Sequence, residues 1–259
     1  MGTEGKEPAR MVACVVARVA LVTGASSGIG AAAAKALARH GFSVAVNYFS
    51  GAEGARAVVA EIEAAGGRAV AIQGDVSRVA DADRIVFETI AHLGALDVLV
   101  NNAGSPVAQK PLAQLDEAEW DRCHAITLKG TWLVSKAAIP HLRGRPGATI
   151  LNISSAAAHT GGHSGHYAAA KAGVHGLTRA LARELAPAIT VNCLAPGTIE
   201  TAFHDKFSTP EHVENNRRLA PMKRAGTAEE VAAWIVFLVD APFTTGQIYD
   251  VNGGLTMPP

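Results

Sequence analysis

Short apolar runs alternate with longer alanine-rich segments along most of this 259-residue chain. The short runs are rich in β-branched residues and apolar throughout, which predicts strands of a parallel sheet covered by helices on both faces. The predicted strands are residues 19–23, 43–48, 69–73, 96–100, 148–153, 189–194 and 247–251, and the predicted helices are residues 28–40, 51–65, 77–93, 116–142, 166–185 and 228–239. This alternation predicts an α/β fold, a single domain with a doubly wound parallel sheet of about seven strands.

Two segments lie outside this alternation. Residues 1–17 carry charged residues ahead of a short apolar patch and lack the long apolar core of a signal peptide. We therefore expect a mobile N-terminal tail at 1–17, followed by a domain at 18–259. Residues 197–226 form a long irregular stretch after the sixth predicted strand. Because loops of this length are usually lids or binding loops, we expect a substrate lid there, with a surface insertion as the alternative.

Composition excludes several classes of protein. The chain has 23 basic and 23 acidic residues, so it lacks the charge footprint of a nucleic-acid-binding protein. The apolar run at 231–239 is much shorter than the roughly 20 residues that span a bilayer, so we expect no membrane partner. Cys14, Cys123 and Cys193 are odd in number and widely spaced, which is typical of reduced thiols in a cytoplasmic protein.

A glycine-rich turn, Thr-Gly-Ala-Ser-Ser-Gly-Ile-Gly at residues 23–30, lies between the first predicted strand and the first predicted helix. Its glycines permit a tight turn and let backbone amides approach a pyrophosphate, and the helix N-terminus presents free N–H groups. Glycines also serve ordinary tight turns, but the strand–turn–helix context favours phosphate binding. The residues expected to hold a dinucleotide here are Gly24, Ser26, Ser27, Gly28, Ile29 and Gly30.

The end of the second predicted strand bears on the choice of dinucleotide. Domains that prefer NAD place an acid there, against the ribose hydroxyls. This chain has Asn47, Tyr48 and Ser50, with no acid before Glu53, so a 2′-phosphate would meet no repulsion. The pattern favours NADP as cofactor. NAD stays possible, because no arginine follows at once and Ser27 stands where a basic residue would help.

Asp75 and Val76 follow the third predicted strand. An aspartate at this point suits the amino group of adenine, so both residues are candidate cofactor contacts. An aspartate before a helix is equally typical of a helix cap, and that alternative stays open.

Tyr167 and Lys171 lie four residues apart and therefore on one face of a predicted helix. A free phenol has a pKa near 10, too high for a base at neutral pH. A neighbouring cation and a positive nicotinamide ring favour the phenolate, so the pair predicts a tyrosine acid/base tuned by a lysine. Ser154 and Ser155 follow the fifth predicted strand, and a hydroxyl there can hold a carbonyl oxygen.

Together, these motifs resemble the classical short-chain dehydrogenase/reductase family, in the family's order from about Arg18 to Gly254. The resemblance implies a Rossmann-like fold and an NADP-preferring oxidoreductase. Such an enzyme transfers a hydride between nicotinamide and a small-molecule carbonyl/secondary alcohol pair. The segments that carry the resemblance are residues 23–30, 101–104, 154–155, 167–171, 196–197, 245–247 and 252–254.

The resemblance also implies roles for individual residues. Tyr167 would be the catalytic acid/base, Lys171 would hold the ribose and lower the tyrosine pKa, and a serine would polarise the carbonyl. Ser155 fits the family's strand ending better, whereas Ser154 gives the more usual spacing to Tyr167; we select Ser155. Further implied cofactor contacts are Asn102, Ala103 and Gly104 on the adenosine side, and Pro196, Gly197, Ile199 and Thr201 at the nicotinamide end.

One position departs from the family pattern. The family has the segment Asn-Leu-Lys-Gly-Thr in its fourth helix. This chain has Thr-Leu-Lys-Gly-Thr at residues 127–131, so Thr127 replaces the family's catalytic asparagine. In the family this asparagine helps to hold a water that connects the lysine to solvent, so we expect an altered proton supply. The departure also motivates a rival interpretation, a nucleotide-binding regulatory protein without turnover.

Substrate class is open between several alternatives. Residues 159–162, 197–204 and 226–230 resemble a subgroup that includes bacterial reductases of keto-deoxy sugar acids, many of them labelled 3-oxoacyl-ACP reductases. An NAD-dependent sugar or polyol dehydrogenase is the alternative enzyme. Lys206, Arg217 and Arg218 in the expected lid could meet an anionic substrate or form a solvated charged face.

Two further expectations concern metals and assembly. His159, His163 and His166 lack supporting carboxylates, so we expect no metal site and place them at the substrate mouth or in solvent. The apolar helix around 231–239 and the C-terminal strand resemble the family's self-association surfaces. The resemblance therefore implies a homotetramer or homodimer.

Overall fold

Seven parallel strands form one sheet in the computed structural model of this chain, which describes residues 17–162, 164–201, 203 and 207–257. Their order across the sheet is β3-β2-β1-β4-β5-β6-β7. The strand β1 lies between β2 and β4: Val22 of β1 is paired with Val46 of β2 on one side and with Val100 of β4 on the other. The strands are β1 (Val19–Val22), β2 (Ser43–Tyr48), β3 (Ala69–Gln73), β4 (Val98–Asn101), β5 (Thr149–Ile153), β6 (Thr190–Pro196) and β7 (Ile248–Val251). The predicted doubly wound sheet is confirmed.

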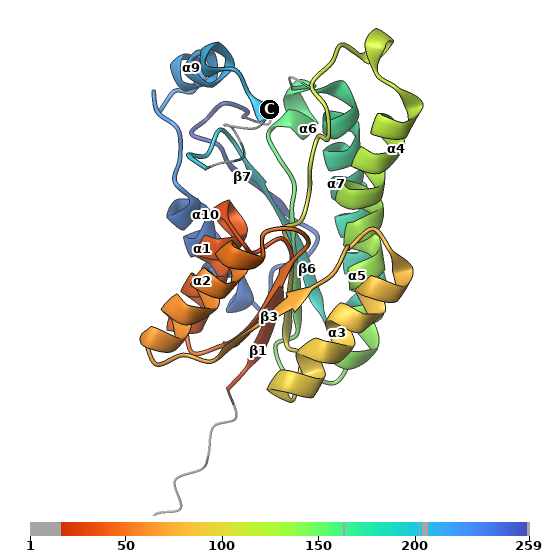
Figure 1. The fold of residues 1–259 in the computed structure, drawn as a ribbon, viewed down its shortest axis with the longest axis vertical. Coiled ribbons are helices and arrows are strands. Elements are labelled where there is room, and N and C mark those ends of the chain that lie inside the picture. The colour runs from red at the N-terminus through yellow and green to blue at the C-terminus, as the bar shows by residue number, and fades with distance from the viewer. Residues whose placement is uncertain (1–16, 163, 202, 204–206, 258–259) are drawn as a thin grey trace, which may run out of the picture.

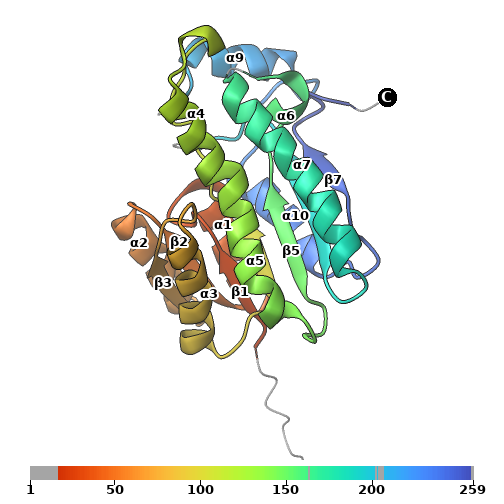
Figure 2. The same ribbon diagram turned by 90° about the vertical axis from the view of Figure 1, so that its right-hand side faces the viewer.

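Helices cover both faces of the sheet, because successive residues of each strand point to opposite sides. Ala20 and Val22 of β1 join one apolar cluster, and Val19 and Leu21 join the other. Figures 1 and 2 show the two helix layers with the sheet between them. One layer contains α1 (Gly28–Arg39), α2 (Ala52–Ala64) and α10 (Ala228–Val239), and the other contains α3 (Val79–Leu93), α5 (Gly130–Leu142) and α7 (Gly165–Leu185).

Three shorter helices lie beyond the carboxyl edge of the sheet, at the top of Figure 1. They are α4 (Glu117–His124), α6 (Ala157–Thr160) and α9 (Pro210–Leu219), and a 3-10 turn, η1 (Leu112–Gln114), precedes α4. All strands end at this edge, so the loops that follow them converge there. In open α/β sheets this is where ligands bind.

Two predicted segments differ from the structure. The stretch 197–226 is not irregular throughout, because α9 occupies ten of its residues. Thr209 caps this helix by accepting a hydrogen bond from the His212 N–H at 3.2 Å, and Pro210 takes the first helical position. The single helix predicted at 116–142 is divided by a π-helical turn, η2 (Ala125–Lys129), between α4 and α5.

Several expectations fall on residues outside the described part of the chain. These are almost the whole N-terminal tail, Cys14, His163 and Lys206. Cys123 and Cys193 are buried free thiols. Within the described ranges, no helix is long and apolar enough to cross a membrane.

Candidate active site

The glycine-rich turn packs tightly against the loop that follows β4. Gly24 and Gly28 have φ values of +61° and +55°, a left-handed conformation that favours glycine. A methyl group on Gly30 would lie 2.5 Å from both the Gly24 carbonyl oxygen and the Asn102 Nδ2. The turn therefore requires glycine at these positions, and it leaves a backbone-walled hollow at the N-terminus of α1 that suits a pyrophosphate.

Asn102 and Thr23 hold this turn in place. The Asn102 Nδ2 donates to the carbonyl oxygens of Thr23 and Gly24 at 2.9 and 3.0 Å. The Thr23 Oγ1 accepts from the N–H groups of Asn102 and Ala103 at 3.0 and 3.1 Å. These bonds join the carboxyl ends of β1 and β4 and fix the loop 102–104 beside the turn.

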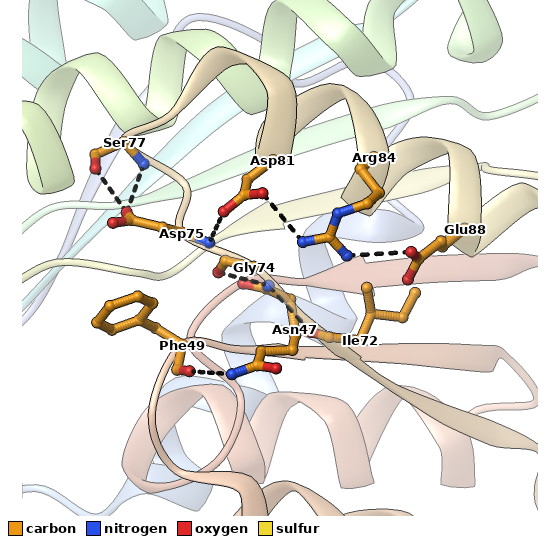
Figure 3. A network of polar contacts seen from close by, with 10 residues as sticks. Asn47, Phe49, Ile72, Gly74, Asp75, Ser77, Asp81, Arg84 and Glu88 are labelled. Carbon is orange, nitrogen blue, oxygen red and sulfur yellow. Dashed lines mark hydrogen bonds and ion pairs between the residues drawn. The ribbon is translucent and has the colours of Figure 1, made fainter.

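Asn47 is buried at the end of β2, with an exposed fraction of 1%. Its Oδ1 accepts from the Gly24 N–H at 3.3 Å, and its Nδ2 donates to the carbonyl oxygens of Ile72 and Gly74 at 3.2 and 3.3 Å. Figure 3 shows Asn47 beside two of these neighbours, Ile72 and Gly74. Its side chain therefore joins the glycine-rich turn to the end of β3, a different task from the cofactor contact expected of it.

Asp75 is likewise engaged with protein groups. Its Oδ1 accepts from the N–H and hydroxyl of Ser77 at 3.0 and 2.6 Å (Figure 3), and its Oδ2 accepts from Arg122 at 3.0 Å. Burial raises the pKa of Asp75, but the bonds from Ser77 and Arg122 outweigh burial and hold this pKa below its usual value. Sequence reasoning missed Arg122, because an arginine inside a predicted helix belongs to no motif.

Tyr167 and Lys171 lie one turn apart on α7, with the Lys171 Nζ 5.5 Å from the centre of the Tyr167 ring. Lys171 is buried, and its Nζ donates to the Ile153 carbonyl oxygen at the end of β5 at 2.6 Å. Burial lowers the pKa of Lys171 to about 8, so the group is still mainly cationic at neutral pH. Burial also raises the pKa of Tyr167 well above its usual value near 10, so the phenol stays protonated and can act as an acid.

The two candidate serines differ in their surroundings. Ser154 is buried, and its hydroxyl donates to the Lys171 carbonyl oxygen at 3.0 Å. The Ser155 Oγ accepts from the Ala157 N–H at 3.1 Å, which orients the oxygen while its own hydrogen can be donated elsewhere. This geometry favours Ser155 as the residue that holds a carbonyl oxygen.

Thr127 lies in η2 and is fully buried. Its Oγ1 accepts from the Ser105 N–H at 3.3 Å and donates to the Ser105 carbonyl oxygen at 3.4 Å. A methyl group on Gly104 would lie 3.0 Å from the Lys171 Nζ and 3.6 Å from the Thr127 Cγ2. The threonine hydroxyl therefore joins the loop after β4 to the π-turn, and Gly104 of this loop packs closely against Lys171.

Two cavities meet at Ser155 and Tyr167. The larger, of about 480 Å³, extends from the glycine-rich turn to α7, and the smaller, of about 200 Å³, extends from there to α9. The residues that line both are Ser155, Tyr167, Gly197, Phe203 and Phe207. The other expected residues that line the larger cavity are Gly24, Ser26, Ser27, Gly28, Ile29, Ser50, Asn102, Ala103, Gly104, Lys171, Pro196, Ile199 and Thr201. Four expected cofactor residues, Asn47, Tyr48, Asp75 and Val76, are not part of that lining, and Gly30 packs inside the turn.

The chain resembles known proteins over most of its length. A family model described as "Enoyl-(Acyl carrier protein) reductase" matches residues 24–256. The chain belongs to the short-chain dehydrogenase/reductase family. The family, the Rossmann-like fold and the oxidoreductase class predicted from the sequence are thereby confirmed.

Relatives of this short-chain dehydrogenase/reductase span its full domain. It is 40% identical to a 3-oxoacyl-(acyl-carrier-protein) reductase of Synechocystis sp., over 94% of this chain and 98% of the relative. It is 43% identical to 3-oxoacyl-(acyl-carrier-protein) reductase FabG of Staphylococcus aureus, over 92% and 98%. A solved short-chain dehydrogenase from Burkholderia cenocepacia in complex with NADP has a TM-score of 0.86 at 37% identity, covering 92% of this chain and 97% of that chain.

Three of the remaining candidates are buried or paired in this reductase fold. His166 is fully buried, with its Nε2 2.5 Å from the Pro106 carbonyl oxygen, so the prediction that it lines the substrate mouth or faces solvent is wrong. His159 lies 3.3 Å from the Asp250 carboxylate. In the expected lid, Arg217 forms an ion pair with Glu200 at 2.8 Å and lines neither of the two cavities.

Proposed function

We propose that this enzyme reduces a ketone to a secondary alcohol with NADPH as the hydride donor. The observation that carries the proposal is that Ser155 and Tyr167 line both cavities. A dinucleotide in the larger cavity and a carbonyl compound in the smaller one would meet at these two side chains. Such an arrangement brings the reacting groups together and shields them from water.

A bound nicotinamide dinucleotide supplies the hydride that adds to the carbonyl carbon. The Ser155 hydroxyl donates a hydrogen bond to the carbonyl oxygen and holds it toward Tyr167. As negative charge develops on that oxygen, the Tyr167 hydroxyl transfers its proton there. The Lys171 cation stabilises the phenolate that remains, since its Nζ lies over the same ring. The dehydrogenase direction uses the same groups in reverse.

The charges around the larger cavity support NADP over NAD. Among the described residues, its lining contains two cations, Arg122 and Lys171, and no aspartate or glutamate. The hydroxyl groups of Ser27 and Ser50 lie at the end where the 2′-phosphate of NADP would be bound. Arg122 is already paired with Asp75, so the support comes from the serine hydroxyls and from the lack of an acidic residue in the described lining. The NADP complex of the Burkholderia relative is consistent with this preference.

The smaller cavity favours a neutral substrate of the 3-oxoacyl type. Its described lining residues contain no aspartate, glutamate, lysine or arginine, and Phe203, Phe207 and Leu219 make much of it apolar. The anion of a keto sugar acid would therefore be desolvated there without a charged partner, which is unfavourable. The names of the Synechocystis and Staphylococcus relatives, both 3-oxoacyl reductases, agree with a neutral 3-oxoacyl group.

Loss of reduced-cofactor absorbance tests the proposal, with NADPH and NADH compared on each substrate. The panel contains a 3-oxoacyl thioester, a keto-deoxy sugar acid, an aldose and a simple diketone. We expect turnover of the thioester with NADPH. Turnover of aldoses with the NAD pair would establish the sugar dehydrogenase alternative instead. Tight dinucleotide binding without turnover would favour the regulatory interpretation.

We also propose that the enzyme is a homo-oligomer, a tetramer or a dimer. Trp234 and Phe237 of α10 are exposed, although their rings pack at 5.8 Å and border a surface depression of about 610 Å³ beside the edge strand β7. Exposed aromatic patches of this kind mark association surfaces. Light scattering should report an oligomer that Phe237→Glu dissociates, whereas Phe87→Glu, on the exposed side of α3, should leave it intact. A monomeric wild-type chain would contradict this.

A further inference from the structure

The loop after β4 turns sharply at Val107, beside the smaller cavity. The Ala108 N–H donates to the Pro106 carbonyl oxygen at 2.6 Å, and Val107 between them has a φ of +64°. A three-residue turn with this hydrogen bond is a γ-turn, and with a positive φ at its centre it is the rare, strained form. Valine adds to the strain, because a β-branched side chain fits poorly in this region. Such a backbone persists only where its surroundings hold it.

Two side chains hold this turn. The Ser105 Oγ accepts from the Val107 N–H at 3.1 Å. The Nε2 of His166 lies 2.5 Å from the Pro106 carbonyl oxygen. A carbonyl oxygen can only accept, so the Nε2 carries the hydrogen and donates it. The Pro106 carbonyl oxygen therefore accepts two hydrogen bonds, one that closes the turn and one from α7.

Stability alone does not favour histidine at position 166. The side chain is fully buried, and its Nδ1 has no hydrogen-bond partner among the described residues. A leucine or phenylalanine would fill this space without leaving a polar atom unpaired, which is costly in a protein interior. What histidine supplies here, and an apolar side chain would not, is the hydrogen bond to Pro106.

The turn forms part of the wall of the smaller cavity. Pro106 and Gln109, on either side of Val107, both line this cavity, and so does Tyr167. His166 immediately precedes Tyr167 on α7, so its ring joins this wall to the helix that carries the proposed proton donor. A displaced turn would move the wall relative to the tyrosine hydroxyl, and a misplacement of about 1 Å is enough to slow a reaction strongly.

We propose that His166 is a positioning residue, which holds the strained turn at Val107 and thereby places the wall of the substrate cavity against Tyr167. This inference rests on the proposed function and adds to it a residue that lines neither cavity. Loss of the hydrogen bond should therefore impair the use of the ketone substrate and leave dinucleotide binding intact.

Steady-state reduction of a 3-oxoacyl thioester by the full-length chain tests the role of His166, with the NADPH Kd measured in parallel. His166→Phe keeps a buried ring but has no donor, so the KM for the thioester should rise roughly tenfold while the NADPH Kd stays unchanged. His166→Leu repeats this test with a smaller apolar side chain. His166→Gln, whose amide can donate from a similar distance, should restore the wild-type KM. His175→Phe, the same substitution at another buried histidine of α7, is the matched control and should leave the KM unchanged.

A glycine at position 107 tests whether the strained turn is what His166 holds. Glycine adopts a positive φ readily, so the turn would need less support. Val107→Gly in the His166→Phe background should therefore recover most of the lost KM, a non-additive result that indicates coupled residues. A double variant with a KM as high as that of His166→Phe would overturn the link between His166 and the turn.

Hydrogen–deuterium exchange of residues 105–110 gives a readout that does not depend on turnover. Exchange should be faster in His166→Phe than in wild type and His166→Gln, because the turn would open more often. Unchanged exchange in His166→Phe, or a KM raised equally in His166→Gln and His166→Phe, would overturn the positioning role. A wild-type chain without turnover would contradict the proposed function, whereas exchange would still decide whether His166 holds the turn.

Discussion

Asn47 and Ser50 lie three residues apart, yet their surroundings differ completely. Asn47 is still within β2, where its amide joins the glycine-rich turn to the loop after β3. Ser50 lies beyond the strand and lines the larger cavity, which is proposed to hold the dinucleotide. Because a shift of one residue turns a strand side chain to the other face, the sequence could indicate the segment but not which residue reaches the ligand.

Asn47→Asp should destabilise the protein without changing cofactor preference. The carboxylate would lose both donated hydrogen bonds and place its charge beside the carbonyl oxygens of Ile72 and Gly74, a cost of about 2–4 kcal/mol. Urea unfolding at pH 7 measures the loss. Unchanged stability together with a shift of cofactor preference toward NADH would instead show that Asn47 contacts the ribose of the cofactor.

Ser50→Asp should move the preference toward NADH. A carboxylate at this position repels the 2′-phosphate and can accept hydrogen bonds from ribose hydroxyls, so the NADPH/NADH ratio of kcat/KM should fall by roughly tenfold or more. Steady-state kinetics with both cofactors measures this ratio, and Ser50→Asn is the neutral control. An unchanged ratio in Ser50→Asp would show that the 2′-phosphate does not bind at this end of the cavity.

At the scale of elements, the strands were predictable because a strand buried on both faces is apolar at every position. The sequence Val-Ala-Leu-Val of β1 is an example, with all four residues buried. The helix α9 was missed because its ten residues are strongly polar and show no apolar stripe. The start of α9 was nevertheless recognisable in the sequence, because Thr209 is a typical N-cap residue and Pro210 is favoured at the first helical position. The π-turn η2 depends on a local change in backbone hydrogen bonding, which apolar periodicity does not report.

The packing of α6 against α7 predicts an acid-sensitive stability. Burial, together with the charges of His159, Arg179 and Lys171, lowers the pKa of His175 to about 4. Between pH 6.5 and 4 the unfolded chain binds a proton that the folded one does not, so this group makes stability fall as the pH falls through that range.

His175→Phe keeps the ring contact with His159 and cannot be protonated. The free energy of unfolding should therefore depend less steeply on pH between 6.5 and 4 in this variant, as measured by urea unfolding. His141→Gln, at an exposed histidine, is the control and should keep the wild-type slope. An unchanged slope in His175→Phe would contradict the assignment.

At the scale of the whole molecule, the residues proposed for nucleotide binding and those proposed for proton transfer lie on different halves of one sheet. The glycine-rich turn and Ser50 follow β1 and β2, whereas Ser155 and Tyr167 belong to the end of β5 and to α7. The sequence could indicate both halves because each depends on a short local motif. It could not indicate Arg122, whose partners Asp75 and Ser77 are more than forty residues away. That contact exists only once α4 is positioned beside the loop after β3.

Tyr167, at the junction of the two cavities, is the proposed proton donor. The decisive measurement is NADPH oxidation with a 3-oxoacyl thioester by wild type, Tyr167→Phe and Tyr249→Phe, with the NADPH Kd of each measured in parallel. We expect Tyr167→Phe to lose turnover by roughly 100- to 10,000-fold while its Kd changes little, and Tyr249→Phe, in β7, to behave like wild type. Turnover by Tyr167→Phe at a rate close to wild type would show that Tyr167 is not the proton donor.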